Sequence, residues 1–266
     1  MELEKAKTAI KDAYYEMPAS WQSDLGESYP EDLFTIFDDY LRVYQGTKQP
    51  QQTEKSFELT VGKHGEEPIV FVGKIDELYL RKRNGVKSVT IGEHKTFSTK
   101  PSMDVLIMNT QKCLYAKAVQ ILKGVLPDKV KWDYIRSTPA SFPIWLEKSQ
   151  RFSDAASSKI TPMSWERACA SRGISDPEII RKGDKFKANI SDFFFQVVLD
   201  ISPAMVDNIW QGFLYTAKQI VSCGETNKSK NLTRNCSWCA YHDICYSELT
   251  GGDTEYLIAR DFTERR

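Results

Sequence analysis

The stretch GKIDELYLRKRNGVKSVTIGEHKT, residues 73–96, places acidic and basic side chains inside two apolar runs that otherwise have the pattern of β-strands. Asn84-Gly85 separates the runs, and Asn-Gly is a strong hairpin signal because both residues tolerate a positive φ. Residues equidistant from such a tight turn face each other. Asp76 lies eight residues before Asn84 and Glu93 lies eight after Gly85. The hairpin therefore predicts two directly opposed carboxylates.

Opposed carboxylates destabilise a sheet unless something positive lies between them, and a divalent cation is the obvious candidate. Lys95 lies on the same face as Glu93, because side chains at i and i+2 of a strand point the same way. Mg²⁺ or Mn²⁺ binds hard carboxylate oxygens, and an ammonium group orients the attacking water or stabilises developing charge. This grouping predicts metal-dependent phosphodiester hydrolysis. The competing interpretation is an exposed hairpin with ordinary solvated charges.

The segments that follow carry a resemblance to a known family. GKID (73–76) followed by EHK (93–95) resembles the core of the PD-(D/E)xK nuclease superfamily. QKCLY (111–115) resembles the extra Gln-x-x-x-Tyr motif of its RecB-like, CRISPR-associated exonuclease-like branch, and that branch also ends in CxxC and a further Cys, as residues 236–245 do. The resemblance covers residues 70–245, and the text from residue 133 onward is similar in style to phage-encoded members.

This resemblance implies an α/β, restriction-endonuclease-like core, a small mixed sheet flanked by helices, with a helical, cysteine-ligated C-terminal region. It implies that Asp76, Glu93 and the backbone carbonyl of His94 hold Mg²⁺ or Mn²⁺ and that Lys95 completes the catalytic set. It also implies that Gln111 and Tyr115, one helical turn apart, support DNA binding beside the active site. The competing role for Tyr115 is that of a core aromatic residue.

The sequence departs from the family pattern upstream of the hairpin. Members usually place a histidine or an acidic residue on a preceding helix as a further metal ligand, but no histidine precedes His64 here, and His64 is expected in a surface turn beside Gly65. Four acidic residues are alternatives, and the sequence does not choose among them: Glu31, Asp32, Asp38 and Asp39.

Four cysteines near the end of the chain form a C-x12-C-x2-C-x5-C pattern: Cys223, Cys236, Cys239 and Cys245. Four thiolates suit either a [4Fe–4S] cluster or a tetrahedral Zn²⁺ site. The resemblance favours iron–sulfur, although family members take the first ligand from far upstream and no cysteine here precedes Cys113. Cys223 is one substitute, and His242 completing a zinc site is another. Packing as small apolar residues is the third interpretation, and the expected one for Cys113 and Cys169.

Composition bounds the remaining classes. The chain has 266 residues, with 36 Lys and Arg against 36 Asp and Glu, so no global field steers it toward polyanions or membranes. No signal-type segment or apolar run of membrane-spanning length is present, which favours a cytoplasmic protein, in the bacterial host if phage-encoded. We expect a nuclease core with N-terminal helices at 1–222 and a cysteine-rich cap at 223–266.

Periodicity predicts the main elements. Helices are expected at 4–17, 30–46, 103–124, 161–173 and 202–224, with Thr161, Pro162 and Glu166 starting the fourth. Three antiparallel strands are expected between residues 55 and 96, and a further strand at 128–138. Residues 140–190 give no clear pattern.

These observations predict a metal-dependent deoxyribonuclease, an exonuclease acting on DNA ends or single strands in recombination, repair or CRISPR-like adaptation. Phosphates would meet basic side chains in RKRNGVK (81–87) and at Lys228, Lys230 and Arg234. The alternatives are a structure-specific endonuclease and a non-catalytic, zinc-bearing nucleic-acid-binding module.

Overall fold

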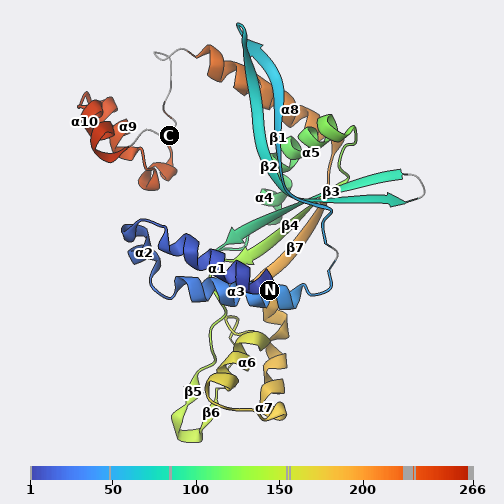
Figure 1. Cartoon of the computed structure of the whole chain (residues 1–266), viewed down its shortest axis with the longest axis vertical. Coiled ribbons are helices and arrows are strands. Elements are labelled where there is room, and N and C mark those ends of the chain that lie inside the picture. Colours follow the sequence, from blue (N-terminus) through green and yellow to red (C-terminus); the bar gives the residue numbers. More distant parts are fainter. Residues whose placement is uncertain are drawn as a thin grey trace. The chain divides into compact units, whose positions relative to one another are not determined.

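A computed structural model describes residues 2–47, 49–83, 86–153, 155, 157–223, 230 and 232–262 (Figure 1). The chain divides into two compact units, one of residues 1–63 with 68–214 and the other of residues 64–67 with 215–266. The first unit holds the sheet, and the second holds the cysteine-rich end.

A five-stranded mixed sheet forms the centre of the first unit. Its strands are β1 (Gln52–His64), β2 (Glu67–Arg83), β3 (Val86–Phe97), β4 (Lys129–Arg136) and β7 (Phe194–Asp200), in the order β1-β2-β3-β4-β7. β3 runs antiparallel to β2 and parallel to β4, and β4 runs antiparallel to β7. This mixed sheet with flanking helices confirms the predicted fold class.

The register of β2 and β3 follows the count made from the turn. Pairs run from Arg83 with Val86 to Glu77 with Gly92, and one further step in the same register sets Asp76 opposite Glu93. The backbone N–H of His94 donates to Asp76 Oδ2 at 2.9 Å, which links β3 to the middle of β2. Asn84 and Gly85 themselves lie outside the described residues.

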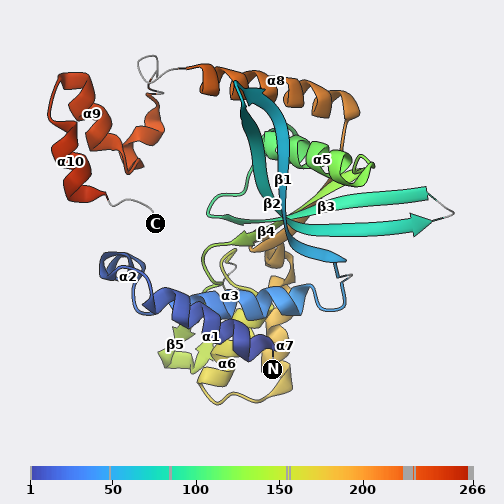
Figure 2. The ribbon, with the colours of Figure 1, turned by 45° about the horizontal axis from the view of Figure 1, so that its top comes forward.

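Two helices cover one face of the sheet, α5 (Thr110–Lys123) and the first half of α8 (Pro203–Ser222) (Figure 2). The main hydrophobic core lies between them and the strands, where Ile75, Ile91 and Trp132 are at most 1% exposed. Burial of this apolar surface is the main stabilising contribution to the unit.

The opposite face packs against α3 (Tyr29–Val43), whose Ile36 and Tyr40 meet Phe194 and Ile135 from the sheet. α1 (Glu2–Tyr15) contacts α3, and the short helix α2 (Ala19–Leu25) connects them in sequence. Strand β4 alternates strictly, since Val130 and Trp132 enter the main core while Lys131 and Asp133 belong to the α3 side. The α3 side of the sheet is therefore partly polar.

The predicted helix at 103–124 is wrong in one respect, because it is two helices. α4 (Met103–Ile107) ends before Asn109, and α5 begins at Thr110. Asn109 has an extended backbone and its side chain accepts from the backbone N–H of Lys112, so it caps α5. A capping residue in mid-segment outweighs the apolar spacing that runs through it.

An insertion of small elements lies between β4 and β7: β5 (Trp145–Leu146), a 3₁₀ turn (Glu147–Ser149), β6 (Arg151–Phe152), α6 (Pro162–Ser171), α7 (Pro177–Arg181) and a 3₁₀ segment (Lys182–Asp192). It has its own small core around Trp165, Phe152 and Phe186. The predicted start of α6 is correct at Thr161, but its capping partner is Ser164 rather than Glu166. Glu166 instead pairs with Arg42 of α3 at 2.6 Å.

The second unit contains a 3₁₀ turn (Arg234–Trp238), α9 (His242–Thr250) and α10 (Thr254–Asp261). Neither α9 nor α10 contains a buried residue. Within the described part of the chain, no helix is both long enough and apolar enough to cross a membrane.

Candidate active site

Glu93 is the centre of the predicted catalytic group. Its Oε1 accepts from Lys95 Nζ at 2.6 Å and from the Gln111 side-chain amide at 2.9 Å. Strand β3 supplies Glu93 and Lys95 by the i, i+2 alternation, and the first turn of α5 supplies Gln111. Two elements far apart in sequence thus fix one carboxylate.

The second oxygen of this carboxylate has no partner. Glu93 is 4% exposed, and its Oε2 is buried without a hydrogen bond among the described residues. Burial raises the pKa of Glu93, and Asp76 adds to this, although Lys95 and Gln111 act in the opposite direction. A buried, unsatisfied carboxylate oxygen is costly unless something positive binds it.

Asp76 is half-buried in the middle of β2, one residue beyond the pair of Glu77 with Gly92, and its Oδ2 accepts from the backbone N–H of His94. The pair offers hard oxygen donors, including the unpartnered Oε2, which is the donor chemistry that Mg²⁺ and Mn²⁺ prefer. Among the described residues, no group of three or more His, Cys, Asp or Glu side chains lies close enough together to hold a metal ion. The residues present therefore fit a two-carboxylate site completed by backbone or water oxygens.

Tyr115 lies one turn after Gln111 on α5, but its ring is set in the core. It packs edge-on against Phe57 of β1, with ring centroids 5.9 Å apart, and is partly buried. Gln111 by contrast contacts Glu93 directly. The two members of the motif thus have different surroundings in this structure.

The upstream acidic alternatives on α3 have other partners. Asp39 is buried and makes two hydrogen bonds with Arg167 of α6, at 2.5 and 2.9 Å. Asp38 lies 3.9 Å from Lys7, and Glu31 lies 3.8 Å from Lys11. Asp32 occupies the first turn of α3. The structure brings none of these four into a group with Asp76 and Glu93.

A second polar cluster lies on the α3 side of the same strands. Tyr79 donates to Glu77 Oε2 at 2.7 Å, and Lys131 Nζ lies 2.6 Å from the Tyr79 hydroxyl and 3.2 Å from Glu77 Oε2. The His94 ring also lies on this side, with Nε2 3.3 Å from Glu77 Oε1. Burial alone would lower the pKa of Lys131, but Tyr79 and Glu77 outweigh it and leave the pKa raised.

Asp133 extends this cluster into the interior. The residue is fully buried, and its Oδ2 accepts from the Tyr40 hydroxyl at 2.8 Å and from Gln196 Nε2 at 2.7 Å. Its Oδ1 has no hydrogen-bond partner among the described residues. Burial and the neighbouring Asp133 carboxylate both raise the pKa of Tyr40, so this phenol stays protonated as a donor.

Gly92 gives this cluster its space. It pairs with Glu77, and a Cβ built on it would lie 2.9 Å from Glu77 Cβ and 3.0 Å from Tyr79 Cε2. A glycine at position 92 is therefore required by close packing, because any side chain would displace Glu77 and Tyr79.

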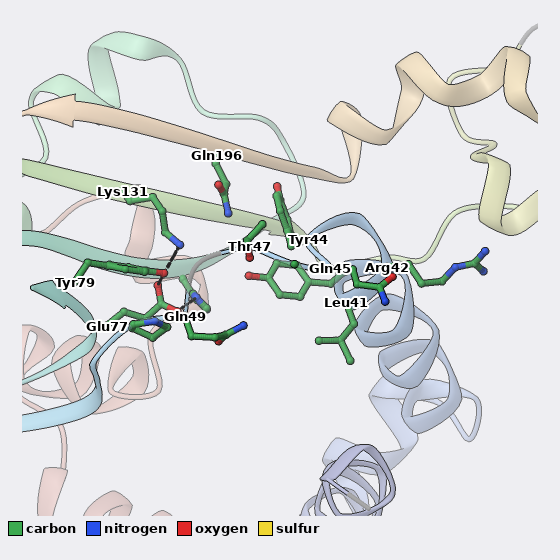
Figure 3. Close-up of a pocket in the computed structure, with 14 residues that line it drawn as sticks. Leu41, Arg42, Tyr44, Gln45, Thr47, Gln49, Glu77, Tyr79, Lys131 and Gln196 are labelled. Carbon is green, nitrogen blue, oxygen red and sulfur yellow. Dashed lines mark hydrogen bonds and ion pairs between the residues drawn. The ribbon is translucent and has the colours of Figure 1, made fainter. Parts of the chain in front are cut away.

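A cavity of about 550 Å³ opens beside this cluster, between the end of α3 with the following loop and the sheet (Figure 3). Thr47, Tyr79, Lys131 and Gln196 also line an adjoining cavity of about 340 Å³. Sequence reasoning missed this region. The alternation of Lys129, Lys131 and Asp133 with Val130, Trp132 and Tyr134 was the available signal, since it marks a strand with one polar face.

The cysteines fall into two groups. Cys113 and Cys169 are buried among apolar side chains, which confirms the prediction made for them. Cys236, Cys239 and Cys245 line one cavity of about 510 Å³ together with His242, whereas Cys223 is not among its lining residues. The structure does not bring three of these ligands within metal-binding distance of one another in the described residues.

The basic segments predicted to meet phosphate are only partly described. Arg81 is exposed, while residues 84 and 85 and the neighbouring side chains of the hairpin tip lie outside the described residues. Lys230 pairs with Glu248. Lys228 and the side chain of Arg234 also lie outside them. His64 is exposed at the end of β1, as predicted for a surface residue.

Comparison with known proteins identifies the class. A sequence model described as "PD-(D/E)XK nuclease superfamily" matches residues 2–246, nearly the whole chain. The chain belongs to the PD-(D/E)XK nuclease superfamily. Membership implies a nuclease that acts on nucleic acid, and nucleases of this superfamily generally use Mg²⁺ or Mn²⁺.

The other comparisons add little to this. The search of curated proteins gave no significant match. A solved structure described as "Crystal structure of SSO0001" aligns over 90% of this chain and 80% of that chain, with 12% identity and a TM-score of 0.38. A similarity at this level supports no argument about this chain.

Proposed function

We propose that this protein is a Mg²⁺- or Mn²⁺-dependent deoxyribonuclease that degrades DNA from ends or as single strands. One observation supports this above all others: Glu93 is buried near Asp76, and its Oε2 has no hydrogen-bond partner in the part of the chain that the structure describes. In a nuclease superfamily, such an oxygen is best explained as a metal ligand.

The proposed roles follow from the contacts. Asp76 and Glu93 would hold the metal, with the backbone carbonyl of His94 as a further ligand, and the metal would supply Lewis-acid chemistry for activating water and offsetting charge on the phosphate. Lys95, 2.6 Å from Glu93, positions the attacking water or stabilises the developing negative charge. Gln111 donates to Oε1 of Glu93, so it leaves Oε2 available to the metal. Tyr115 supports the DNA beside this site through its place on α5.

The test is cleavage of end-labelled linear single-stranded DNA with and without Mn²⁺ or Mg²⁺. We expect Glu93→Gln and Lys95→Met each to lower the rate at least about hundredfold, because each removes an electrostatic contribution to the transition state. Glu58→Gln, an exposed glutamate on β1, is the matched control and should cleave at the wild-type rate. Normal cleavage by both site variants would remove Glu93 and Lys95 from the mechanism.

A circular single-stranded substrate separates the two nuclease modes. An exonuclease leaves a circle intact because it needs an end, whereas cutting of the circle would show the structure-specific endonuclease alternative. Binding of both substrates without any metal-dependent cleavage would instead favour the non-catalytic nucleic-acid-binding module.

We also propose that residues 223–266 form a cap held by a [4Fe–4S] cluster, with Zn²⁺ as the alternative. Support comes from the cavity that Cys236, Cys239 and Cys245 share, since thiolates are soft donors suited to either group. Iron, sulfide and zinc should be measured on protein purified without oxygen. Loss of iron in Cys223→Ser with retention in His242→Ala supports a four-cysteine cluster. Stoichiometric zinc lost in His242→Ala supports the zinc site, and absence of all three elements removes the cofactor.

The biological setting is part of the same proposal. We infer a nuclease core at 1–222 that works in the cytoplasm, in a bacterial host if the chain is phage-encoded, during recombination, repair or CRISPR-like adaptation. Tighter binding to DNA ends or single strands than to a covalently closed circular duplex of equal length is the expected property.

A further inference from the structure

We propose that the cavity on the α3 side of the sheet is a nucleotide-binding site, distinct from the catalytic carboxylates. The inference rests on the proposed function for its choice of nucleic acid as the ligand. The ligand chemistry is that of one nucleotide, a planar base with its phosphate, which is either part of a DNA strand or free.

The size and position of the cavity suit such a ligand. Its volume of about 550 Å³ falls within the range of roughly 300–1,000 Å³ that small-molecule sites occupy. The adjoining cavity of about 340 Å³ shares four lining residues with it, so the two cavities lie side by side and are together named the groove. Figure 3 shows side chains from the loop that follows α3 and from the strands around the same space, while Arg42 of α3 extends away from it.

The lining of the larger cavity, of about 550 Å³, matches a base. Tyr40, Tyr44 and Tyr79 supply aromatic surface, with the Tyr40 and Tyr44 ring centroids 4.9 Å apart. The amides of Gln45, Gln49 and Gln196 supply both donors and acceptors, which is what the edge of a base requires. Aromatic stacking and edge hydrogen bonds are the two means by which proteins hold unpaired bases.

The charges around the larger cavity disfavour an anionic group there. Lys131 lies 3.2 Å from Glu77 and 3.8 Å from Asp133, so two carboxylates face one ammonium group. A phosphate would be repelled by this excess of negative charge, whereas a neutral base is compatible with it. Two buried atoms remain without hydrogen bonds among the described residues, His94 Nε2 and Asp133 Oδ1.

The adjoining cavity supplies the cations that a phosphate needs. Arg81 and Lys129 line it beside Thr90 and Lys131. Arg81 is exposed and has no ion-pair partner among the described residues, and Lys129 pairs with the exposed Asp200 at 2.5 Å. When a base lies in the larger cavity, its phosphate can therefore meet basic side chains in the adjoining cavity of the same groove.

The site is separate from the catalytic one although it uses the same strand. His94 lines the cavity, while its neighbours Glu93 and Lys95 project from the other face of the sheet. Loss of nucleotide binding at the cavity is thus measurable in a protein that cannot cleave, and the two proposals fail independently.

The experiment uses Thr47, an exposed loop residue that lines both cavities. Thr47→Trp fills the groove, and Thr60→Trp, at an exposed position of β1 that lines neither cavity, is the matched control. Both are made in the full chain carrying Glu93→Gln, without divalent metal, after thermal unfolding has shown that they fold. Binding of a 15-nucleotide oligodeoxyadenylate is measured by fluorescence anisotropy and that of deoxyadenosine monophosphate by equilibrium dialysis. Arg81→Gln provides a second, less bulky variant.

We expect Thr47→Trp to raise the Kd for the oligonucleotide at least about tenfold, the effect of losing one stacked base, and Thr60→Trp to leave it unchanged. Arg81→Gln should weaken binding of the oligonucleotide and leave the other measured properties unchanged. Weakened binding of the monophosphate alone would identify a free nucleotide as the ligand. Equal Kd values for Thr47→Trp and Thr60→Trp with both probes would overturn the site. Cleavage by the unmodified protein judges the proposed function separately.

Discussion

At the scale of single residues, Glu93 is a side chain whose burial lowers the stability of the folded protein. A buried carboxylate with one unpaired oxygen opposes folding, and the two groups that do contact it share the same oxygen atom. Such a residue is retained for what it binds rather than for what it contributes to stability.

A first prediction concerns the pH dependence of stability. Because the pKa of Glu93 is raised in the folded protein above its ordinary value of 4.5, the folded state keeps a proton that the unfolded state has released. The free energy of unfolding therefore falls as pH rises from that ordinary value through the folded pKa, and stays low above it. Without divalent metal, Glu93→Gln should be more stable than wild type at pH 7, with the difference disappearing toward pH 4.

Thermal unfolding from pH 4 to pH 8 checks this, with Glu58→Gln as the exposed control. Addition of Mn²⁺ should reverse the order at pH 7, because a ligand at a hundred times its Kd stabilises the folded state by about 2.7 kcal/mol and the variant lacks the ligand atom. A wild type that is more stable than Glu93→Gln at every pH without metal would contradict the prediction.

At the scale of elements, the packing of β3 depends on Gly92 having no side chain. Gly92 lets Glu77 and Tyr79 lie flat over the strand. Gly92→Ala should lower the free energy of unfolding by about 1–3 kcal/mol, the usual cost of overpacking. Gly212→Ala in α8, where a Cβ meets nothing within 4 Å, should instead stabilise by about 0.5–1 kcal/mol. Urea unfolding of both variants measures the contrast, and two effects of the same sign would show that Gly92 is not confined.

The ion pair between Asp39 of α3 and Arg167 of α6 gives a second prediction at the scale of elements. Asp39→Ala leaves the partly buried Arg167 without its carboxylate and should cost about 3 kcal/mol. Asp38→Ala, one residue away, removes only an exposed 3.9 Å pair and should change stability by less than about 0.5 kcal/mol. The same two variants assayed for cleavage with Mn²⁺ test the upstream-ligand hypothesis: a folded Asp38→Ala protein that has lost cleavage would identify Asp38 as that ligand.

The elements that could be predicted are those governed by local rules. Counting from Asn84-Gly85 gave the register of β2 and β3, because a two-residue connection leaves no freedom in pairing. The split between α4 and α5 was not predicted, because Asn109 fits the apolar spacing of a longer helix and reveals its capping role only through its backbone. The cluster of Tyr40, Glu77 and Asp133 was not predicted either. Tyr40 and Asp133 are 93 positions apart in the sequence, and no local pattern encodes their contact.

At the scale of the whole molecule, the two compact units differ in how they are stabilised. The first has a continuous apolar core, whereas Tyr246, Leu249 and Tyr256 in the helices of the second are each more than half exposed. A segment this small with so little buried apolar surface usually needs a metal or cluster to fold. The proposed cysteine cofactor would supply that stabilisation.

Calorimetry should therefore show two transitions. Cys245→Ser, or removal of the cofactor, should abolish the transition of residues 215–266 and leave the transition of the sheet-containing unit within about 2 °C. Cys169→Ser, at a cysteine buried in the first unit, should have the opposite selectivity. A single transition shifted equally by both substitutions would show that the units unfold together.

The alternation along β3 has a consequence for how this nuclease can change. Within residues 93–95, the side chains of Glu93 and Lys95, assigned to the proposed metal chemistry, alternate with that of His94, which lines the cavity on the α3 side. An insertion or deletion of one residue there would exchange the two sets of side chains between the faces of the sheet. A change in the length of this segment would therefore destroy both functions. Variation in such a segment is confined to substitution, and any transfer of this active site to another protein would have to move β2 and β3 as one block.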